Sequence, residues 1–179
     1  FWYGTRMTKS TKQSEKRSLR VAFIHAPDPI YADTQNYGAK FMPVWAYTLG
    51  AHIPGDGRFN LSLHDCRFQS ELDIAEADIF LFSGINQDCG NLERVRADLK
   101  RRFSDALSII GGPICWSFDQ AGSMAQLDGF DHIFIGDGED EIADILEKVR
   151  LGEPLERVRR VNKRFKITNA KPFYRPMLD

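Results

Sequence analysis

Short apolar runs recur along the chain and predict five β-strands. Residues 19–26 and 78–84 are apolar without a helical period, as expected of strands that are buried on both faces. Residues 58–66 alternate between apolar and polar positions, which indicates a strand that is exposed on one face or lies near an edge. Two shorter runs, residues 107–112 and 132–136, complete the five strands.

Three longer segments predict α-helices between or after these strands. Residues 91–106 place an apolar stripe on one side, and residues 41–53 tolerate Pro43 because it falls in the first turn. Residues 139–152 carry acidic residues in the first turn and Gly152 just past the end, which suits the helix dipole and a glycine C-cap. The stripe of the second helix consists of Leu92, Val95, Leu99 and Phe103.

The alternation of strands with helical segments predicts the α/β class. Right-handed crossovers wind such units into a doubly wound, open parallel sheet, here five-stranded and of the Rossmann-like or flavodoxin-like type. We expect this domain to span residues 19–152. A disordered basic tail (residues 1–18) would precede it, and a basic linker (residues 153–179) would follow it.

The composition argues against several classes of partner. The chain has 24 basic and 25 acidic residues, so it has no overall field that would attract nucleic acid or an anionic membrane. No apolar stretch approaches the ~20 residues that a membrane span needs. The cysteines are odd in number and lack C-x-x-C spacing, which favours a reducing cytoplasm over a disulfide scaffold or a thiolate metal site. We therefore expect a cytoplasmic protein that binds neither nucleic acid nor membrane.

Ligands of open parallel sheets bind beyond the carboxyl ends of the strands, so the residues that follow each strand matter most. The loop after residues 19–26 has no glycine before Gly38, which disfavours both the G-x-G-x-x-G dinucleotide fingerprint and a P-loop. The same loop is long and carries proline, unlike the tight turn of a flavin mononucleotide site. A phosphoacceptor receiver would need Asp and Lys where Ser83 and Gly136 stand. None of these four common sites of the fold is expected.

Small residues end three of the predicted strands. Glycine lets a planar or bulky group lie close to the backbone, and serine adds a hydroxyl group. A tight turn from strand to helix explains any one of these glycines. Their coincidence at three strand ends favours a broad ligand slot rather than a catalytic centre. The small residues are Ser83 and Gly84, Gly111 and Gly112, and Gly136 and Gly138.

The ordered set of strand ends resembles the cobalamin (B12)-binding domain at the N-terminus of many radical S-adenosylmethionine (radical SAM) enzymes. The family's helix P-P-L-G-L-A-Y-L-A is similar to M-P-V-W-A-Y-T-L-G-A at 42–51. Its third strand ends in a serine, as in S-G-I at 83–85, and its fourth strand ends in G-G-P, as at 111–113. Its G-E-G-E turn is similar to G-D-G-E at 136–139. The likeness covers roughly residues 20–150.

The resemblance implies that the domain binds cobalamin, with the nucleotide tail of the cofactor buried between the strand ends. The serine and the glycine pair would line the tail, and the G-D-G-E turn would border it. It implies no catalytic or metal-ligating residue. The predicted cofactor-binding residues are Pro27, Asp28, Ser83, Gly84, Ile85, Gly111, Gly112, Pro113, Gly136, Asp137, Gly138 and Glu139.

The chain departs from the family pattern at two points. Trp45 replaces a small residue of the helix motif, so it either packs into part of the slot, which we favour, or stacks on a ligand. The D-x-H-x-x-G motif, whose histidine ligates cobalt in mutases and methionine synthase, is absent, and His25 lacks its spacing. We therefore assign His25 to hydrogen bonding at the strand end and His64 to a structural role, and we expect cobalamin without a protein histidine as its lower ligand.

The end of the chain suggests a wider context. Residues 151–179 resemble the linker that leads to the catalytic barrel of these enzymes. The C-x-x-x-C-x-x-C signature of the barrel does not occur, so the 4Fe–4S cluster and S-adenosylmethionine would belong to a downstream radical SAM domain. We expect a non-catalytic cobalamin-binding module that serves radical or methyl-transfer chemistry in that domain. The alternatives are a B12-free relic of the fold with an interaction or substrate-shaping role, and an independent flavodoxin-like enzyme.

Overall fold

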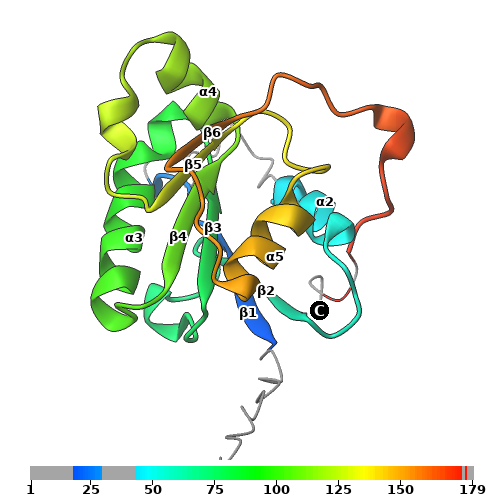
Figure 1. Cartoon of the computed structure of the whole chain (residues 1–179). Coiled ribbons are helices and arrows are strands. Elements are labelled where there is room, and N and C mark those ends of the chain that lie inside the picture. The colour runs from blue at the N-terminus through cyan, green and yellow to red at the C-terminus, as the bar shows by residue number, and fades with distance from the viewer. Residues whose placement is uncertain (1–17, 30–42, 175, 177–179) are drawn as a thin grey trace, which may run out of the picture.

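The structure is a computed structural model that describes residues 18–29, 43–174 and 176. Within these residues six strands form an open sheet in which every neighbouring pair is parallel (Figure 1). The strand order is β2-β1-β3-β4-β5-β6, which is Rossmann-like and begins with the flavodoxin-like order. The strands are β1 (Leu19–His25), β2 (Phe59–Asp65), β3 (Ile79–Ser83), β4 (Leu107–Gly111), β5 (His132–Ile135) and β6 (Val158–Arg160).

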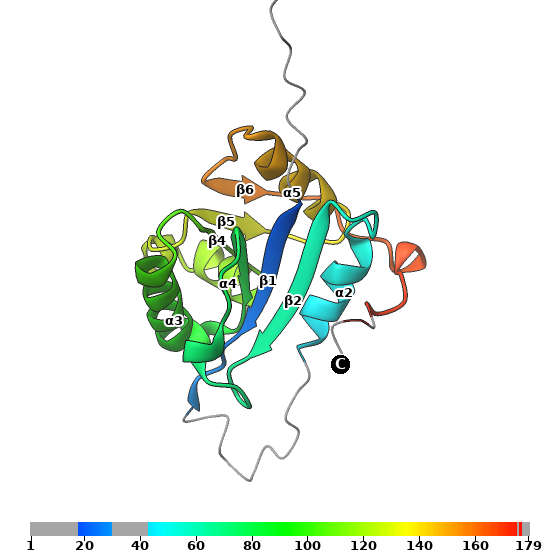
Figure 2. The same cartoon turned by 90° about the horizontal axis from the view of Figure 1, so that it is seen from below.

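Helices cover both faces of the sheet. Helices α2 and α5 pack on one face and α3 and α4 on the other, and Figure 2 shows α2 and α3 on opposite sides of the strands. This two-sided cover confirms the α/β class and the open parallel sheet that the sequence predicts. The four α-helices of the described residues are α2 (Val44–His52), α3 (Cys89–Arg102), α4 (Pro113–Gln120) and α5 (Ile142–Leu151).

The strands divide their side chains between two cores because successive residues of a strand point to opposite faces. In β3, Ile79 and Leu81 belong to the core under α2 and α5, whereas Phe80 and Phe82 belong to the core under α3 and α4. All five residues of β3 are buried. The predicted stripe of α3 joins the second core: Leu92, Val95 and Leu99 are buried, and Phe103 packs against them from just beyond the helix.

The expectation of five strands is wrong, because β6 forms a sixth. It lies in the segment for which the sequence predicts only a basic linker, and its residues V-R-R are too few and too charged to show a strand pattern. Pairing with β5 makes the strand. Arg159 forms an ion pair with Glu141, and Arg160 forms one with Asp119 at 2.6 Å. Tertiary contacts therefore create this strand.

Two helices also differ from the prediction. Helix α4 was not predicted; it begins directly at Pro113, a residue that suits the first helical position, and it is only 8 residues long. Helix α5 begins at Ile142 and not at residue 139, so Glu139 and Asp140 lie in the loop before it. Its predicted end is confirmed, because Gly152 is the C-cap with a φ of +71°.

The chain after β6 runs back toward α2, as the orange-to-red segment of Figure 1 shows. The backbone N–H of Phe165 donates a hydrogen bond to Oδ2 of Asp137 at 2.7 Å, and the ring of Phe165 meets the ring of His52 edge-on at 5.3 Å. Farther along, the N–H of Tyr174 donates to the carbonyl oxygen of Tyr47 at 3.2 Å. This segment therefore connects the turn after β5 with α2.

Two further predictions concern the chain's environment and its N-terminal tail. None of the helices in the described ranges is long and apolar enough to cross a membrane. The predicted basic tail, residues 1–18, lies outside the described residues except for Ser18.

Candidate functional site

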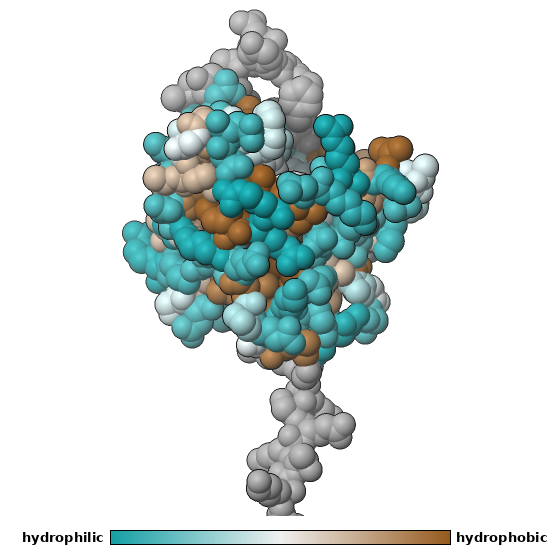
Figure 3. Space-filling model, turned by 45° about the horizontal axis from the view of Figure 1, so that its top comes forward, coloured by the Kyte–Doolittle hydropathy of each residue, from teal (hydrophilic) through white to brown (hydrophobic). Residues whose placement is uncertain are grey.

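A pocket with a volume of about 280 Å³ opens at the carboxyl ends of β3, β4 and β5, on the face that α2 and α5 cover. Figure 3 turns this end of the molecule toward the viewer and shows apolar surface gathered in the middle and ringed by hydrophilic residues. Open α/β sheets bind ligands outside the carboxyl ends of their strands. The pocket therefore lies where the strand-end argument places a ligand.

Apolar side chains form most of the interior of the pocket. Leu81 and Ile109, which are register partners in β3 and β4, form its base together with Phe134 of β5. The ring of Trp45 lines the pocket and lies 5.6 Å from the ring of Phe23, so this residue packs in the core and also faces the site. The helices supply the walls, with Val44, Trp45, Thr48 and Leu49 from α2 and Ile142 and Ile145 from α5.

Most of the predicted site residues come together at this pocket. They belong to the ends of three neighbouring strands, which the register of the sheet brings to one edge. The predicted residues that line the pocket are Ser83, Gly111, Gly112, Pro113, Gly136, Asp137, Gly138 and Glu139.

The other four predicted residues do not line the pocket. The amide of Asn91 donates a hydrogen bond to the carbonyl oxygen of Pro27 at 3.0 Å, and the N–H of Asp28 donates to a carboxylate at the start of α3 at 3.0 Å. Pro27 and Asp28 therefore connect the end of β1 to α3. Gly84 lies in the tight turn from β3 toward α3, where a Cβ would lie 2.9 Å from a carboxylate oxygen, and Ile85 is exposed.

The protein itself requires glycine at two of the lining positions. Gly112 has a φ of +83°, and a Cβ there would lie 2.2 Å from Oγ of Ser83. Gly136 has a φ of +129°, and a Cβ there would lie 2.5 Å from the carbonyl oxygen of Val161. Both positions combine a positive φ with a close neighbour, so only glycine fits without strain. These two glycines follow from chain geometry, and they give no separate support for a ligand.

Gly111 is different, because the fold does not need a glycine there. It has no positive φ, and a Cβ would make only ordinary contacts with Phe134, 3.7 Å from the carbonyl oxygen and 3.8 Å from the Cβ. Gly138 has less room, since its Cβ would lie 3.2 Å from Cδ2 of Leu49. The missing side chain at Gly111 therefore keeps open a space that none of the described residues requires.

Few polar side chains reach the pocket. Ser83 is 8% exposed, and its hydroxyl has no hydrogen bond to any residue that the structure describes. The hydroxyl of Thr48 donates to the carbonyl oxygen of Val44 at 2.9 Å, and Oδ2 of Asp137 accepts the N–H of Phe165. Among the described residues, no base is hydrogen-bonded to Ser83 to make it a nucleophile, and the arrangement suits binding.

The histidines and the buried cysteine lie outside this pocket. His25 is opposite Asp65 in the sheet; its Nδ1 is buried, has no hydrogen-bond partner in the described part of the chain, and burial lowers the pKa of the ring. The expected strand-end hydrogen bond of His25 is therefore not seen at Nδ1. His64 lies 2.9 Å from the carbonyl oxygen of Ser70 through Nε2, as a structural role requires. Burial raises the pKa of Cys115 to about 12, so its thiol stays protonated.

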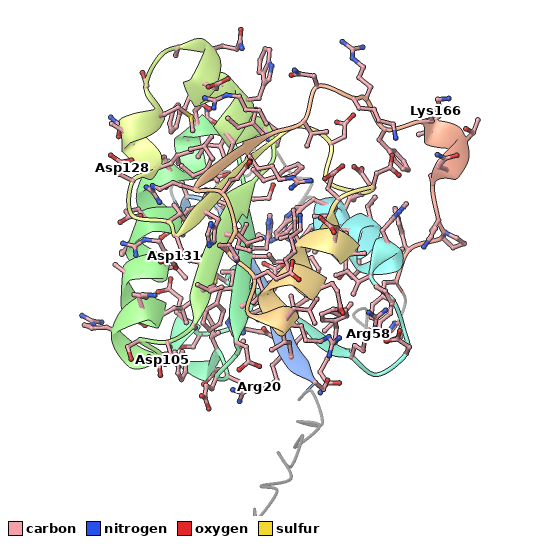
Figure 4. All side chains as sticks on the ribbon, viewed as in Figure 1. Arg20, Arg58, Asp105, Asp128, Asp131 and Lys166 are labelled. Atoms are coloured by element: carbon pink, nitrogen blue, oxygen red, sulfur yellow. The ribbon has the colours of Figure 1, made fainter. Side chains whose placement is uncertain are left out.

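Most charged side chains lie on the outside of the molecule, and Asp137 and Glu139 are the charged residues of the described part of the chain that line the pocket. Figure 4 places Arg20 and Asp105 at the end of the sheet opposite the pocket and Lys166 on the segment after β6. The described residues contain no group of three or more His, Cys, Asp or Glu side chains that is arranged to hold a metal ion. The interior of the site is thus apolar and only its rim is charged.

The base of the pocket was not predicted, although the hydrophobic pattern of the sequence contained a signal for it. Leu81, Ile109 and Phe134 each stand two positions before a small residue at a strand end. Residues two apart in a strand share a face, so these three side chains had to lie directly beneath the cleared edge. The wall residues of α5, Ile142 and Ile145, are apolar, but nothing local in the sequence showed that they face a cavity.

The chain was compared with known proteins. No protein-family model matches it. No curated protein matches it either.

Proposed function

We propose that this domain is a cobalamin-binding module of a radical SAM enzyme. Two observations support the proposal. The strand-end motifs resemble those of the B12-binding family, and the pocket at the same strand ends is apolar and is kept open at Gly111. The open space at Gly111 is the observation that carries the proposal, because no contact among the described residues accounts for it.

The pocket fits one part of cobalamin and not the whole cofactor. Sites for drug-sized ligands typically enclose about 300–1,000 Å³. A volume of about 280 Å³ suits the ring-shaped base at the end of the nucleotide tail. The corrin ring is far larger and has to lie outside the mouth of the pocket, beyond the strand ends.

The proposed roles of the residues follow from their positions. Leu81, Ile109 and Phe134 would pack against the faces and edge of the base, and Trp45 and Ile145 would close the walls. Gly111 would leave the room that the tail occupies. When bound, cobalamin supplies a cobalt centre for methyl transfer or radical chemistry, and this chain's own residues hold the tail and exclude water from it.

Retention of cobalamin tests the proposal. Purified protein mixed with hydroxocobalamin and then desalted is expected to keep the red colour and a corrin absorption band. Gly111→Leu should fill the pocket and weaken retention by at least about tenfold. Gly90→Leu is the matched control, because Gly90 is exposed on α3 and a Cβ there meets nothing within 4 Å.

The outcome separates the proposal from its alternative. A colourless wild-type protein after desalting would favour a B12-free relic with an interaction role. Equal retention by Gly111→Leu and Gly90→Leu would place cobalamin elsewhere on the molecule. The radical SAM context is tested separately by the coding sequence after Asp179, which is expected to contain C-x-x-x-C-x-x-C.

A further inference from the structure

The two edges of the sheet are protected to different degrees. At one edge, β6 has only three residues, V-R-R, and both of its arginines are ion-paired. At the other edge, β2 has seven residues in unbroken register with β1 and contains no proline or lysine (Figure 2). Short strands, charges, prolines and bulges keep natural sheet edges from pairing with other chains. Residues 59–64 have none of these features, so the outer edge of β2 suits the addition of another strand.

The backbone groups on the outer edge of β2 point away from the sheet. The carbonyl oxygen of Arg58 and the N–H of Cys66, at the two ends of the strand, each form a hydrogen bond of 2.9 Å to β1. The even-numbered residues of β2 therefore bond to β1, and the odd-numbered residues direct their N–H and C=O groups outward. In the described part of the chain, no backbone group bonds to the outward groups of Leu61 and Leu63.

The side chains of β2 leave room for a neighbouring strand on both faces. Asn60 and Ser62 are exposed on one face. Leu61 and Leu63 are only half-buried on the other face, where they pack against the core under α2 and α5. Apolar side chains of neighbouring strands stabilise a sheet by contact across the pair. A further strand would therefore cover the open sides of the two leucines.

The charges at the two ends of β2 favour an antiparallel partner. Arg58, just before the strand, forms an ion pair with Asp56 at 2.8 Å and stays 39% exposed. Asp65, the last residue of the strand, forms an ion pair with Arg67 at 2.6 Å. An antiparallel second copy brings the basic start of one strand beside the acidic end of the other, whereas a parallel copy brings like charges together. Like charges that face each other across two strands destabilise their pairing.

We propose that two copies of the chain associate through β2, antiparallel about a two-fold axis at Ser62, and form one continuous sheet. About this axis, Ser62 lies opposite the partner's Ser62 and Leu61 lies opposite the partner's Leu63. The strand thus meets the self-complementarity that a two-fold interface requires. The inference does not rest on the proposed function, because the pocket lies at the ends of β3, β4 and β5 and stays open in the dimer.

The mass of the full chain in solution tests the association. An edge of seven residues makes a small interface, so we expect a concentration-dependent dimer with a Kd in the micromolar range rather than an obligate one. Sedimentation equilibrium is expected to show an average mass that rises from 20.5 kDa toward twice that value. A mass that stays at one copy up to the solubility limit overturns the proposal. So does a mass that rises beyond two copies, because a two-fold contact closes on itself.

Exchange of charges at Ser62 tests the axis. Ser62→Lys and Ser62→Glu each place like charges opposite each other, so each variant alone should dimerise about fivefold more weakly or worse. An equimolar mixture of the two variants is expected to restore the dimer, because unlike charges then face each other. Ser104→Lys is the matched control, since Ser104 is exposed between α3 and β4, away from the edge. Unchanged dimerisation of Ser62→Lys, or a mixture no tighter than the single variants, overturns the pairing about Ser62.

A cross-link tests the register directly. Opposed residues of an antiparallel pair that do not share hydrogen bonds have Cα atoms about 4.5 Å apart, within the range of a disulfide. Ser62→Cys is therefore expected to form a covalent dimer on mild oxidation with diamide, and dithiothreitol should reverse it. Ser104→Cys and the wild type measure the background, because all three proteins keep the native cysteines. Equal cross-linking of Ser62→Cys and Ser104→Cys overturns the register.

Discussion

The two faces of the sheet differ most at the carboxyl ends of the same strands. On the face under α3 and α4, Phe82 of β3 is fully buried, and its ring meets the ring of Phe130 at 5.2 Å in an edge-on contact. The next residue of β3, Ser83, points to the other face and borders a pocket with Gly111 of β4. One residue along a strand separates a filled core from an open site.

The difference does not mean that the whole α2/α5 face of the sheet is poorly packed. The α3/α4 side is closed by Ile114 and Cys115 of α4, each with no exposed surface. The α2/α5 side packs equally well deeper in the sheet, where Val21 and Ile79 have no exposed surface either. Only the last positions of the strands on that side lack bulk, so the opening is local and coincides with the small residues.

We expect the largest difference in stability between the two faces when a phenylalanine is removed from each. Phe130→Ala leaves an enclosed cavity in the filled core and is expected to lower the free energy of unfolding by about 3–5 kcal/mol. Phe134→Ala removes a ring that already borders the pocket, so water can enter the space and the loss should be smaller. Urea unfolding followed by circular dichroism measures both losses. Equal losses in the two variants would mean that the pocket side is as tightly packed as the other.

Addition of bulk should show the same asymmetry, with a smaller effect. Ala26 has no exposed surface and belongs to the core under α3 and α4, so Ala26→Leu overpacks it and is expected to cost about 1–3 kcal/mol. Gly111→Leu extends into the pocket and should cost less, since a Cβ at Gly111 meets only ordinary contacts. The same unfolding measurement compares the two variants. A larger cost for Gly111→Leu would contradict the open pocket.

The smallest of the expected effects is a pH dependence of the free energy of unfolding that comes from His25, at the end of β1. Burial lowers the pKa of His25 in the folded protein; Asp65 and Asp88 oppose this and Arg67 reinforces it. The unfolded chain therefore binds the proton more readily, so the contribution of His25 to stability is complete above pH ~6.5 and is lost as the pH falls below that value.

A variant isolates this contribution. The free energy of unfolding should fall less steeply between about pH 7 and pH 5 in His25→Gln than in the wild type, because the glutamine does not titrate. His64, whose pKa burial also lowers, remains in both proteins and cancels in the comparison. Parallel profiles for the two proteins would show that His25 is not held neutral by the fold.

The sequence predicts the interior of the fold better than its edges. The buried strands and the α3 stripe appear directly in the hydrophobic pattern, because a helix has to bury one face and a central strand has to bury both. β6 could not be predicted in this way, since Arg159 and Arg160 are held by ion pairs with residues far along the chain and by pairing with β5. α4 was missed because a short helix after G-G-P looks like a loop.

The candidate site was predictable in its position and only partly in its detail. Parallel strands bring their carboxyl ends to one edge, so Ser83, Gly111 and Gly136 had to meet there. The sequence could not separate glycines that the chain geometry requires from Gly111, because that distinction depends on the neighbours of each Cβ. Nor could it exclude Pro27 and Asp28, which share the edge but connect to α3.

A crystal structure of the protein grown with hydroxocobalamin tests the central claim most directly. The account predicts that the base of the nucleotide tail lies between α2 and α5, over Leu81, Ile109 and Phe134, with Gly111 in contact with the tail and the corrin ring outside the mouth. A saturated complex whose tail lies elsewhere, with the pocket beside Gly111 filled by solvent, would contradict it.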